Sequence, residues 1–179
     1  MFKFKTIYEN SKFYHFQEII KTVRAIIFIE HKILLVYSKI FNDMMFPGGT
    51  INKNEDKKSA LIRELKEELG CEKVESIKFL GETKEVCYKI NDQAKLIKRK
   101  SYYYLCKIDQ LGKQNLEDYE ILYGLEPKLY QLTDAIKHLQ AELKIRLQKP
   151  SIGLITTIKR EIKVLKYLRR NYARVLQSY

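Results

Sequence analysis

Three glutamates, Glu64, Glu67 and Glu68, lie at positions i, i+3 and i+4 of the segment FPGGTINKNEDKKSALIRELKEELGC. In a helix this spacing places the three carboxylates on one face. Like charges at this distance repel each other, and a divalent cation would neutralise them. Mg²⁺ takes oxygen ligands from one or two carboxylates and shares the rest of its shell with water and substrate phosphates. The pattern therefore predicts metal-assisted chemistry on a phosphate, although the carboxylates alone leave an ordinary solvated helix face open.

The residues around the glutamates predict a rigid support for them. Leu61, Leu65 and Leu69 are four apart and form an apolar stripe on another face of the same predicted helix. Gly70 directly after Leu69 is a suitable C-cap. Before the helix, Phe46-Pro47-Gly48-Gly49 predicts a turn whose glycines let a ligand approach the backbone closely.

The whole segment resembles the box that defines the Nudix family, GX5EX7REUXEEXGU, in which U is aliphatic. Gly49, Glu55 and the run from Arg63 to Gly70 match every fixed polar and glycine position of the box. The match spans residues 49–71, and its single departure is Cys71, which stands where an aliphatic residue is usual. Cysteine behaves as a small buried hydrophobe, so the departure costs the match little.

This resemblance implies an α/β/α sandwich with a mixed β-sheet, in which the box forms a loop-helix-loop. It implies hydrolysis of a phosphoanhydride bond, with Mg²⁺ or Mn²⁺, in a nucleoside diphosphate linked to another group. The implied metal-site residues are the carbonyl of Gly48, the supporting Glu55, and Glu64, Glu67 and Glu68. Glu64, Glu67 and the orienting Arg63 are the implied catalytic residues of the box.

The general base is not fixed by the box, because family members use either a box glutamate or one on a downstream loop. Glu120, in the acidic stretch before the last expected strand, is our candidate for the downstream base, with Glu117 and Glu85 behind it. An ordinary solvated carboxylate is the alternative for each of them. Loops concentrate functional residues, which favours Glu120.

Tyrosines are the candidates for contacting the substrate. Tyr88 lies 17 residues after Cys71, where dinucleoside polyphosphate hydrolases of the family carry a tyrosine; no proline occupies the position typical of the ADP-ribose enzymes. Tyr103 sits in a run of three tyrosines that alternate across a strand, so some of them must face the cleft. We expect Tyr88 and Tyr103 to bind the substrate, which is a dinucleoside polyphosphate, ADP-ribose or a dNTP-like nucleotide. Tyr88 packed on a strand is the alternative.

Length and composition favour one globular domain in the cytoplasm. The chain has 179 residues with 45% hydrophobic and 31% charged residues, and no apolar run long enough to span a membrane. The three cysteines are scattered and odd in number, which argues against both disulfides and a zinc site. No signal-peptide pattern opens the sequence.

Apolar runs predict the other elements. Val23–Ile29 and Lys32–Tyr37 predict strands joined by a turn at Glu30–His31. Residues 1–20 leave open an edge strand or a covering arm, and Gln110–Tyr123 a loop or short helix. We also expect strands at Val74–Gly81, Glu82–Ile90, Lys98–Ile108 and Leu129–Leu132, and a helix capped by Thr133.

The net charge of +12 is concentrated at the C-terminus, where residues 145–179 hold nine basic side chains against Glu161 alone. Apolar residues from Ile155 to Val175 recur near a 3.6-residue period, which predicts a long amphipathic helix with a basic face. We therefore expect a hydrolase domain at 1–150 and a helical extension at 151–179. The extension either packs on the domain or a homodimer partner, or binds RNA or an anionic membrane surface. A non-catalytic module that senses a nucleotide or binds RNA is the alternative to an enzyme.

Overall fold

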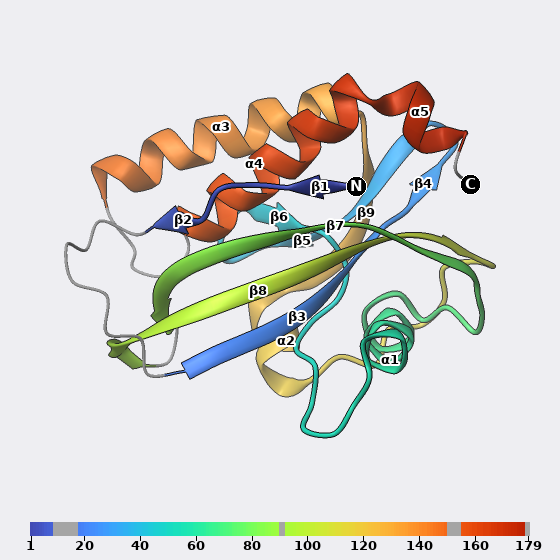
Figure 1. The fold of residues 1–179 in the computed structure, drawn as a ribbon, viewed down its shortest axis with the longest axis horizontal. Coiled ribbons are helices and arrows are strands. Elements are labelled where there is room, and N and C mark those ends of the chain that lie inside the picture. The colour runs from blue at the N-terminus through green and yellow to red at the C-terminus, as the bar shows by residue number, and fades with distance from the viewer. Residues whose placement is uncertain (9–17, 90–91, 150–154, 178–179) are drawn as a thin grey trace.

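The computed structural model describes residues 1–8, 18–89, 92–149 and 155–177 (Figure 1). The strands are β1 (Phe2–Lys3), β2 (Ile7–Tyr8), β3 (Glu18–Ile26), β4 (Phe28–Ile29), β5 (Lys32–Ser38), β6 (Asp43–Met45), β7 (Val74–Lys89), β8 (Asp92–Ile108) and β9 (Leu125–Tyr130). The helices are α1 (Lys57–Leu69), α2 (Asp118–Tyr123), α3 (Leu132–Gln148), α4 (Ile155–Arg170) and α5 (Tyr172–Leu176).

The strands form two sheets that continue into each other where β3 is followed by β4. In the first, β7 pairs antiparallel with β8, β3 runs parallel to β8, and the short β1 and β2 run parallel to β7. In the second, β5 pairs antiparallel with β4, β6 and β9. The mixed α/β architecture expected from the sequence is therefore present.

Helices cover both sides of the sheets. Figure 1 shows α3 and α4 side by side on one side and α1 on the other. Leu61, Leu65 and Leu69 of α1 pack on the apolar residues of β3 and β5 in one core cluster. The second cluster joins α3 and α4 to the opposite side of the strands through residues such as Leu139 and Leu165.

Local sequence explains the two ends of α1. Asp56 caps its N-terminus, because its side chain accepts hydrogen bonds from the backbone N–H groups of Lys58 and Ser59. Gly70 ends the helix in the left-handed conformation, with φ of 65°, and its N–H donates to the carbonyl of Lys66. Further support comes from the following loop, where Gln114 donates to the carbonyl of Glu68.

Several of the sequence predictions on element boundaries were wrong. The stretch expected as two strands meeting at Gly81 is one strand, β7, and Gly81 serves a close approach instead of a turn. It lies opposite Phe2 of β1, and a Cβ at Gly81 would come within 2.5 Å of the Phe2 ring. The strands expected from Val23 and from Lys98 begin earlier, at Glu18 and Asp92. The last strand spans Leu125–Tyr130, and α3 begins at Leu132 with Gln131 as its N-cap, not Thr133.

The N-terminal and C-terminal segments both lie against the domain. β1 and β2 are edge strands, while Phe13, Tyr14 and Phe16 fall outside the described residues. The basic tail contains α4 and α5, which are separated at Asn171, whose side-chain amide donates to the carbonyl of Tyr167. The division of the chain at residue 150 stays a prediction. Within the described ranges, no helix is long and apolar enough to cross a membrane.

Candidate active site

The Pro47-Gly48-Gly49 loop is fixed along the edge of β3. The Val23 N–H donates to the Gly49 carbonyl at 2.9 Å, and the Ala25 N–H donates to the Pro47 carbonyl at 2.7 Å. Gly48 has φ of 121°, and a Cβ there would lie 2.3 Å from the Val23 carbonyl oxygen. Only glycine fits this position, so the backbone itself becomes part of the site.

Two box carboxylates meet this loop. Glu68 Oε2 accepts a hydrogen bond from the Gly48 N–H at 2.6 Å, and the side chain is buried. Glu64 is also buried and lies so close to Gly49 that a Cβ there would come within 2.4 Å of Glu64 Oε2. Burial raises the pKa of Glu68 to about 8, against the lowering influence of Arg24 and the Gly48 N–H. Burial likewise raises the pKa of Glu64, although Arg63 and Arg24 oppose it.

Arg63 links the other predicted carboxylates. Its Nε donates to Glu55 Oε1 at 2.9 Å, and its Nη1 lies 2.9 Å from both Glu64 Oε1 and Glu67 Oε2. Its Nη2 donates to the Thr50 carbonyl at 3.0 Å. The role expected for Arg63, orienting carboxylates through charge-assisted bonds, agrees with these contacts. Glu55 reaches the site only through Arg63.

A cavity of about 220 Å³ opens beside Glu68. Gly48, Gly49 and Glu68 line it, as does Glu120 from α2. Glu120 is buried, its Oε2 accepts the Glu117 N–H at 2.9 Å, and burial raises its pKa. The structure thus brings Glu120 to the same cavity as Glu68 of the box.

The other two base candidates do not share this setting. Glu117 is exposed and caps the N-terminus of α2. Glu85 is fully buried, and its Oε1 lies 2.8 Å from Arg99 Nη1 and 2.7 Å from Arg160 Nη1.

Three arginines that the sequence analysis did not select also line the cavity: Arg24, Arg99 and Arg160. Arg24 Nη1 donates to the carbonyls of Phe46 and Gly48, and its Nε is buried with no partner. The signal for Arg24 was available, because it is the one charged residue within the apolar run Val23–Ile29. Arg160 gave no such signal, since it lies in a tail already rich in basic residues.

Aromatic side chains form another part of the wall. Phe41 and Tyr123 line the cavity with their ring centroids 4.9 Å apart, and Tyr119 lies beside Tyr123. Neither of the expected tyrosines is among them. Tyr103 is fully buried, with its ring against Phe2 and Phe46, because its parity on β8 turns it into the core. Tyr88, near the far end of β7, lines neither this cavity nor the larger hollow described below.

The donors at this site fit a hard divalent cation. They are the carboxylate oxygens of Glu64, Glu67 and Glu68 and the carbonyl of Gly48, all of the type that Mg²⁺ and Mn²⁺ prefer. In the described part of the chain no three acidic, histidine or cysteine groups already form a metal cluster. Arg63 donates to Glu67, and Arg24 donates to the Gly48 carbonyl, so these two oxygens already have partners. Burial raises the pKa values of Glu64 and Glu68.

Comparison with known proteins gives a family match over most of the chain. The family model described as the NUDIX domain matches residues 19–146. An mRNA-decapping protein D9 of rabbit fibroma virus is 34% identical over 102 residues, which is 55% of this chain and 46% of the viral protein. An RNA pyrophosphohydrolase of a Nitratiruptor species is 37% identical over 91 residues, covering 46% of this chain and 56% of that protein. The chain thus spans about half the length of these two curated relatives.

Among solved structures, an ADP-ribose pyrophosphatase from Streptococcus suis has a TM-score of 0.51. It is 19% identical, and the alignment covers 84% of this chain and 92% of the other. At this identity the likeness concerns the fold alone.

Proposed function

Because the chain belongs to the Nudix family, we propose that it is a divalent-metal-dependent pyrophosphohydrolase acting on a nucleoside diphosphate linked to another group. The observation that supports this most is one cavity shared by Glu68, Glu120 and the Gly48–Gly49 backbone. The two buried carboxylates, Glu68 from α1 and Glu120 from α2, suit metal binding and proton transfer. The three arginines of the cavity suit the negative charge of a phosphate chain.

Glu64, Glu67, Glu68 and the Gly48 carbonyl would hold the divalent ion. When bound, the ion neutralises charge on phosphate oxygens and lowers the pKa of a coordinated water. Arg63 orients Glu64 and Glu67 for this role through the contacts described above. Glu68 is held in place by the Gly48 N–H.

Glu120 is the proposed base that takes the proton from the attacking water. Burial raises the pKa of its carboxylate, which makes it a stronger base than an exposed glutamate, and it lines the same cavity as Glu68. Arg24, Arg99 and Arg160 bring positive charge to the phosphate chain. Phe41 and Tyr123 offer rings on which a base can stack.

The first experiment is product release from a panel of substrates with Mg²⁺ or Mn²⁺, with Glu68→Gln as the blank. The panel holds diadenosine polyphosphates, ADP-ribose, canonical and oxidised dNTPs, and RNA with a 5′-triphosphate. We expect one class to be cleaved by the wild type, and both Glu68→Gln and Glu64→Gln to lose turnover while keeping the fold. Near-wild-type rates in those variants would overturn the site. Silence on all substrates with nucleotide binding retained would favour the non-catalytic sensor.

The variant Glu120→Gln tests whether Glu120 or a box glutamate is the general base. Glutamine at this position still accepts the Glu117 N–H, so α2 keeps its cap while the carboxylate is lost. If Glu120 is the base, the rate falls by about 10²-fold or more, and the loss shrinks at low pH, where the wild-type Glu120 is itself protonated. An unchanged rate would assign the proton to a box glutamate instead.

A further inference from the structure

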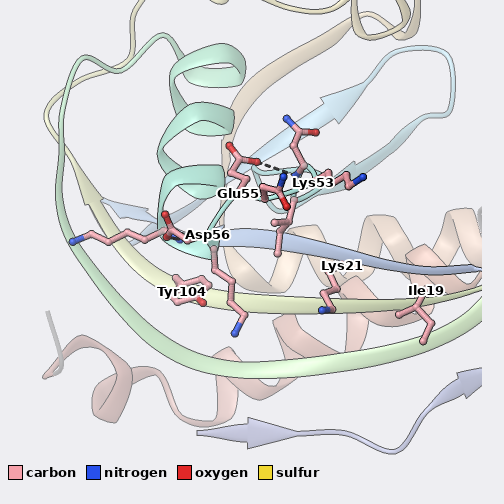
Figure 2. Close-up of a pocket in the computed structure, with 11 residues that line it drawn as sticks. Ile19, Lys21, Lys53, Glu55, Asp56 and Tyr104 are labelled. Carbon is pink, nitrogen blue, oxygen red and sulfur yellow. Dashed lines mark hydrogen bonds between the residues drawn. The ribbon is translucent and has the colours of Figure 1, made fainter.

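A second, larger hollow lies on the other face of β3, next to the start of α1. It has a volume of about 740 Å³ and is open to solvent. Figure 2 shows its wall: Ile19 and Lys21 from β3, Tyr104 from β8, and Lys53, Glu55 and Asp56 from the loop before α1. Of the box carboxylates, Glu55 lines the hollow but Glu64, Glu67 and Glu68 do not, so the lysines of the hollow have no role in the proposed reaction.

The hollow carries a positive charge. Lys21, Lys53, Lys57 and Lys58 all line it and are exposed. Its two carboxylates are already engaged: Glu55 with Arg63 and the Asn52 N–H, and Asp56 with the cap of α1. The lysine ammonium groups therefore remain available for an anionic ligand.

One aromatic ring lies among the lysines of the hollow. Tyr104 of β8 is partly exposed, lines the hollow and meets the ring of Phe79 with centroids 5.4 Å apart. Nearby, Lys57 Nζ lies 4.3 Å and Lys100 Nζ 4.8 Å from the centroid of the buried Tyr102 ring. An accessible ring beside cations is the arrangement that binds single-stranded nucleic acid, in which phosphates meet the cations and a base stacks on the ring.

The hollow also lies near the reaction site. Glu55 lines the hollow, and the guanidinium of Arg63 pairs with both Glu55 and Glu64. Along α1, Lys58 and Glu68 are about 15 Å apart. The lysines are therefore close enough to Glu68 for one extended strand to contact both.

From this geometry we propose that the hollow binds the sugar-phosphate chain of a single-stranded polynucleotide that extends from the active site. The position of the 5′ end rests on the proposed function, whereas binding of the chain does not. The proposed nucleic-acid surface thus lies on the face of β3 and β8, and not on the basic tail that the sequence suggested.

The test is a fluorescence anisotropy titration of the full chain with a labelled single-stranded 12-mer RNA carrying a 5′-hydroxyl. This probe has no anhydride to cleave, so a protein that lacks hydrolase activity still gives a result. We expect the variant Lys21→Ala/Lys53→Ala/Lys58→Ala to bind about tenfold or more weakly at low salt. The slope of log affinity against log salt should shrink by about 2, since each single-strand phosphate contact contributes about 0.7.

A matched control removes the same charge elsewhere. Lys137, Lys144 and Lys163 are exposed on α3 and α4, on the opposite side of the sheets. Their triple alanine variant should bind the RNA as the wild type does. Equal weakening in both triple variants would show that only net charge matters, and no weakening in the first would remove the hollow from binding; either result overturns the proposal.

Substitutions of Tyr104 test the stacking. Tyr104→Leu keeps much of the packing but removes the ring, so affinity should fall about tenfold, while Tyr104→Phe should retain it. The affinity for the RNA 12-mer is then compared with the affinity for a DNA 12-mer of the same sequence, and the tighter of the two identifies the type of strand that the hollow prefers. Duplex RNA or poly-glutamate binding as tightly as the single strand would overturn the proposal.

Discussion

At the scale of single residues, the two glycines of the loop perform different tasks. A Cβ at Gly48 would collide with the backbone of Val23, and the residue has positive φ. A Cβ at Gly49 would meet only the end of the Glu64 side chain, at 2.4 Å from Oε2. Gly48 is thus required by the fold, whereas Gly49 makes room for a carboxylate of the site.

We therefore predict that Gly49→Ala loses activity without losing the fold. Displacing Glu64 by the ångström or so that a methyl group requires lowers kcat by about 10²-fold. The melting temperature should change little, because a side-chain end moves more cheaply than a backbone. Gly48→Ala is the contrast: strain from positive φ, of about 1–3 kcal/mol, adds to the backbone collision and lowers the melting temperature clearly. If the two variants lost stability equally, the assigned difference between the glycines would be refuted.

At the scale of elements, α4 is the helix that the sequence describes least well. It lies beyond the residues matched by the family model, yet Ile158, Leu165 and Leu168 are buried in the core. It also places Arg160 in the cavity wall and against Glu85 of β7. Burial alone would raise the pKa of Glu85, but Arg160 and Arg99 lower it below its ordinary value of 4.5.

The lowered pKa of Glu85 makes the stability of the fold depend on pH. A carboxyl group whose pKa is lower in the folded state than in the unfolded state stabilises the fold at pH values above the unfolded pKa. That stabilisation is lost as the pH falls through the folded pKa. Arg160→Met leaves the buried carboxylates of Glu85 and Glu161 each with one partner fewer, which costs about 3–5 kcal/mol near pH 7. We predict that the gap in melting temperature between wild type and variant is largest near pH 7 and shrinks as pH falls below 4.5.

Thermal unfolding at pH 7 and near pH 4 measures this gap. Lys163→Met is the control, because Lys163 is exposed on the same helix and should show almost no gap at either pH. A gap for Arg160→Met that stayed constant with pH would mean that packing, not the ion pair, accounts for the loss.

The elements also show what the sequence was able to predict. The sequence predicted α1 correctly from the apolar stripe of Leu61, Leu65 and Leu69 and from Gly70 at its end. These features are local in the sequence, and local features are enough to predict a capped helix. Which of the three tyrosines on β8 faces the hollow was not predictable. Parity on a strand is set by its pairing, here Val23 with Tyr102 and Arg24 with Tyr103 in the β3–β8 register. Arg160 reaches the cavity through a tertiary contact with no local signature.

At the scale of the whole molecule, the two sites differ in charge. Carboxylates and three arginines line the 220 Å³ cavity, whereas lysines outnumber carboxylates around the hollow on the other face of β3. The net charge of +12 adds a general attraction for polyanions. Under the two proposals, the whole surface attracts a phosphate-bearing chain, and the chain is cleaved at its 5′ end beside the carboxylates.

Buried carboxylates without a cation also cost the whole fold free energy, which predicts a large effect of metal on stability. Glu64 and Glu68 are both buried, and the carboxylate of Glu64 adds to the cost of ionising Glu68. A cation that binds only the folded state adds about 2.7 kcal/mol at a hundredfold excess over its Kd. For a chain of this size we expect Mg²⁺ or Mn²⁺ to raise the melting temperature by about 5–10 °C, and EDTA to reverse the rise.

The control variant for this effect is Glu68→Gln, which removes one ligand. It should melt close to the metal-free wild type at pH 7, because Glu68, with its pKa of about 8, is mostly neutral there and the amide still accepts the Gly48 N–H. It should also gain little from Mg²⁺ or Mn²⁺. A full metal-induced rise in Glu68→Gln would place the ion elsewhere on the molecule, and no rise in the wild type would refute binding at these carboxylates.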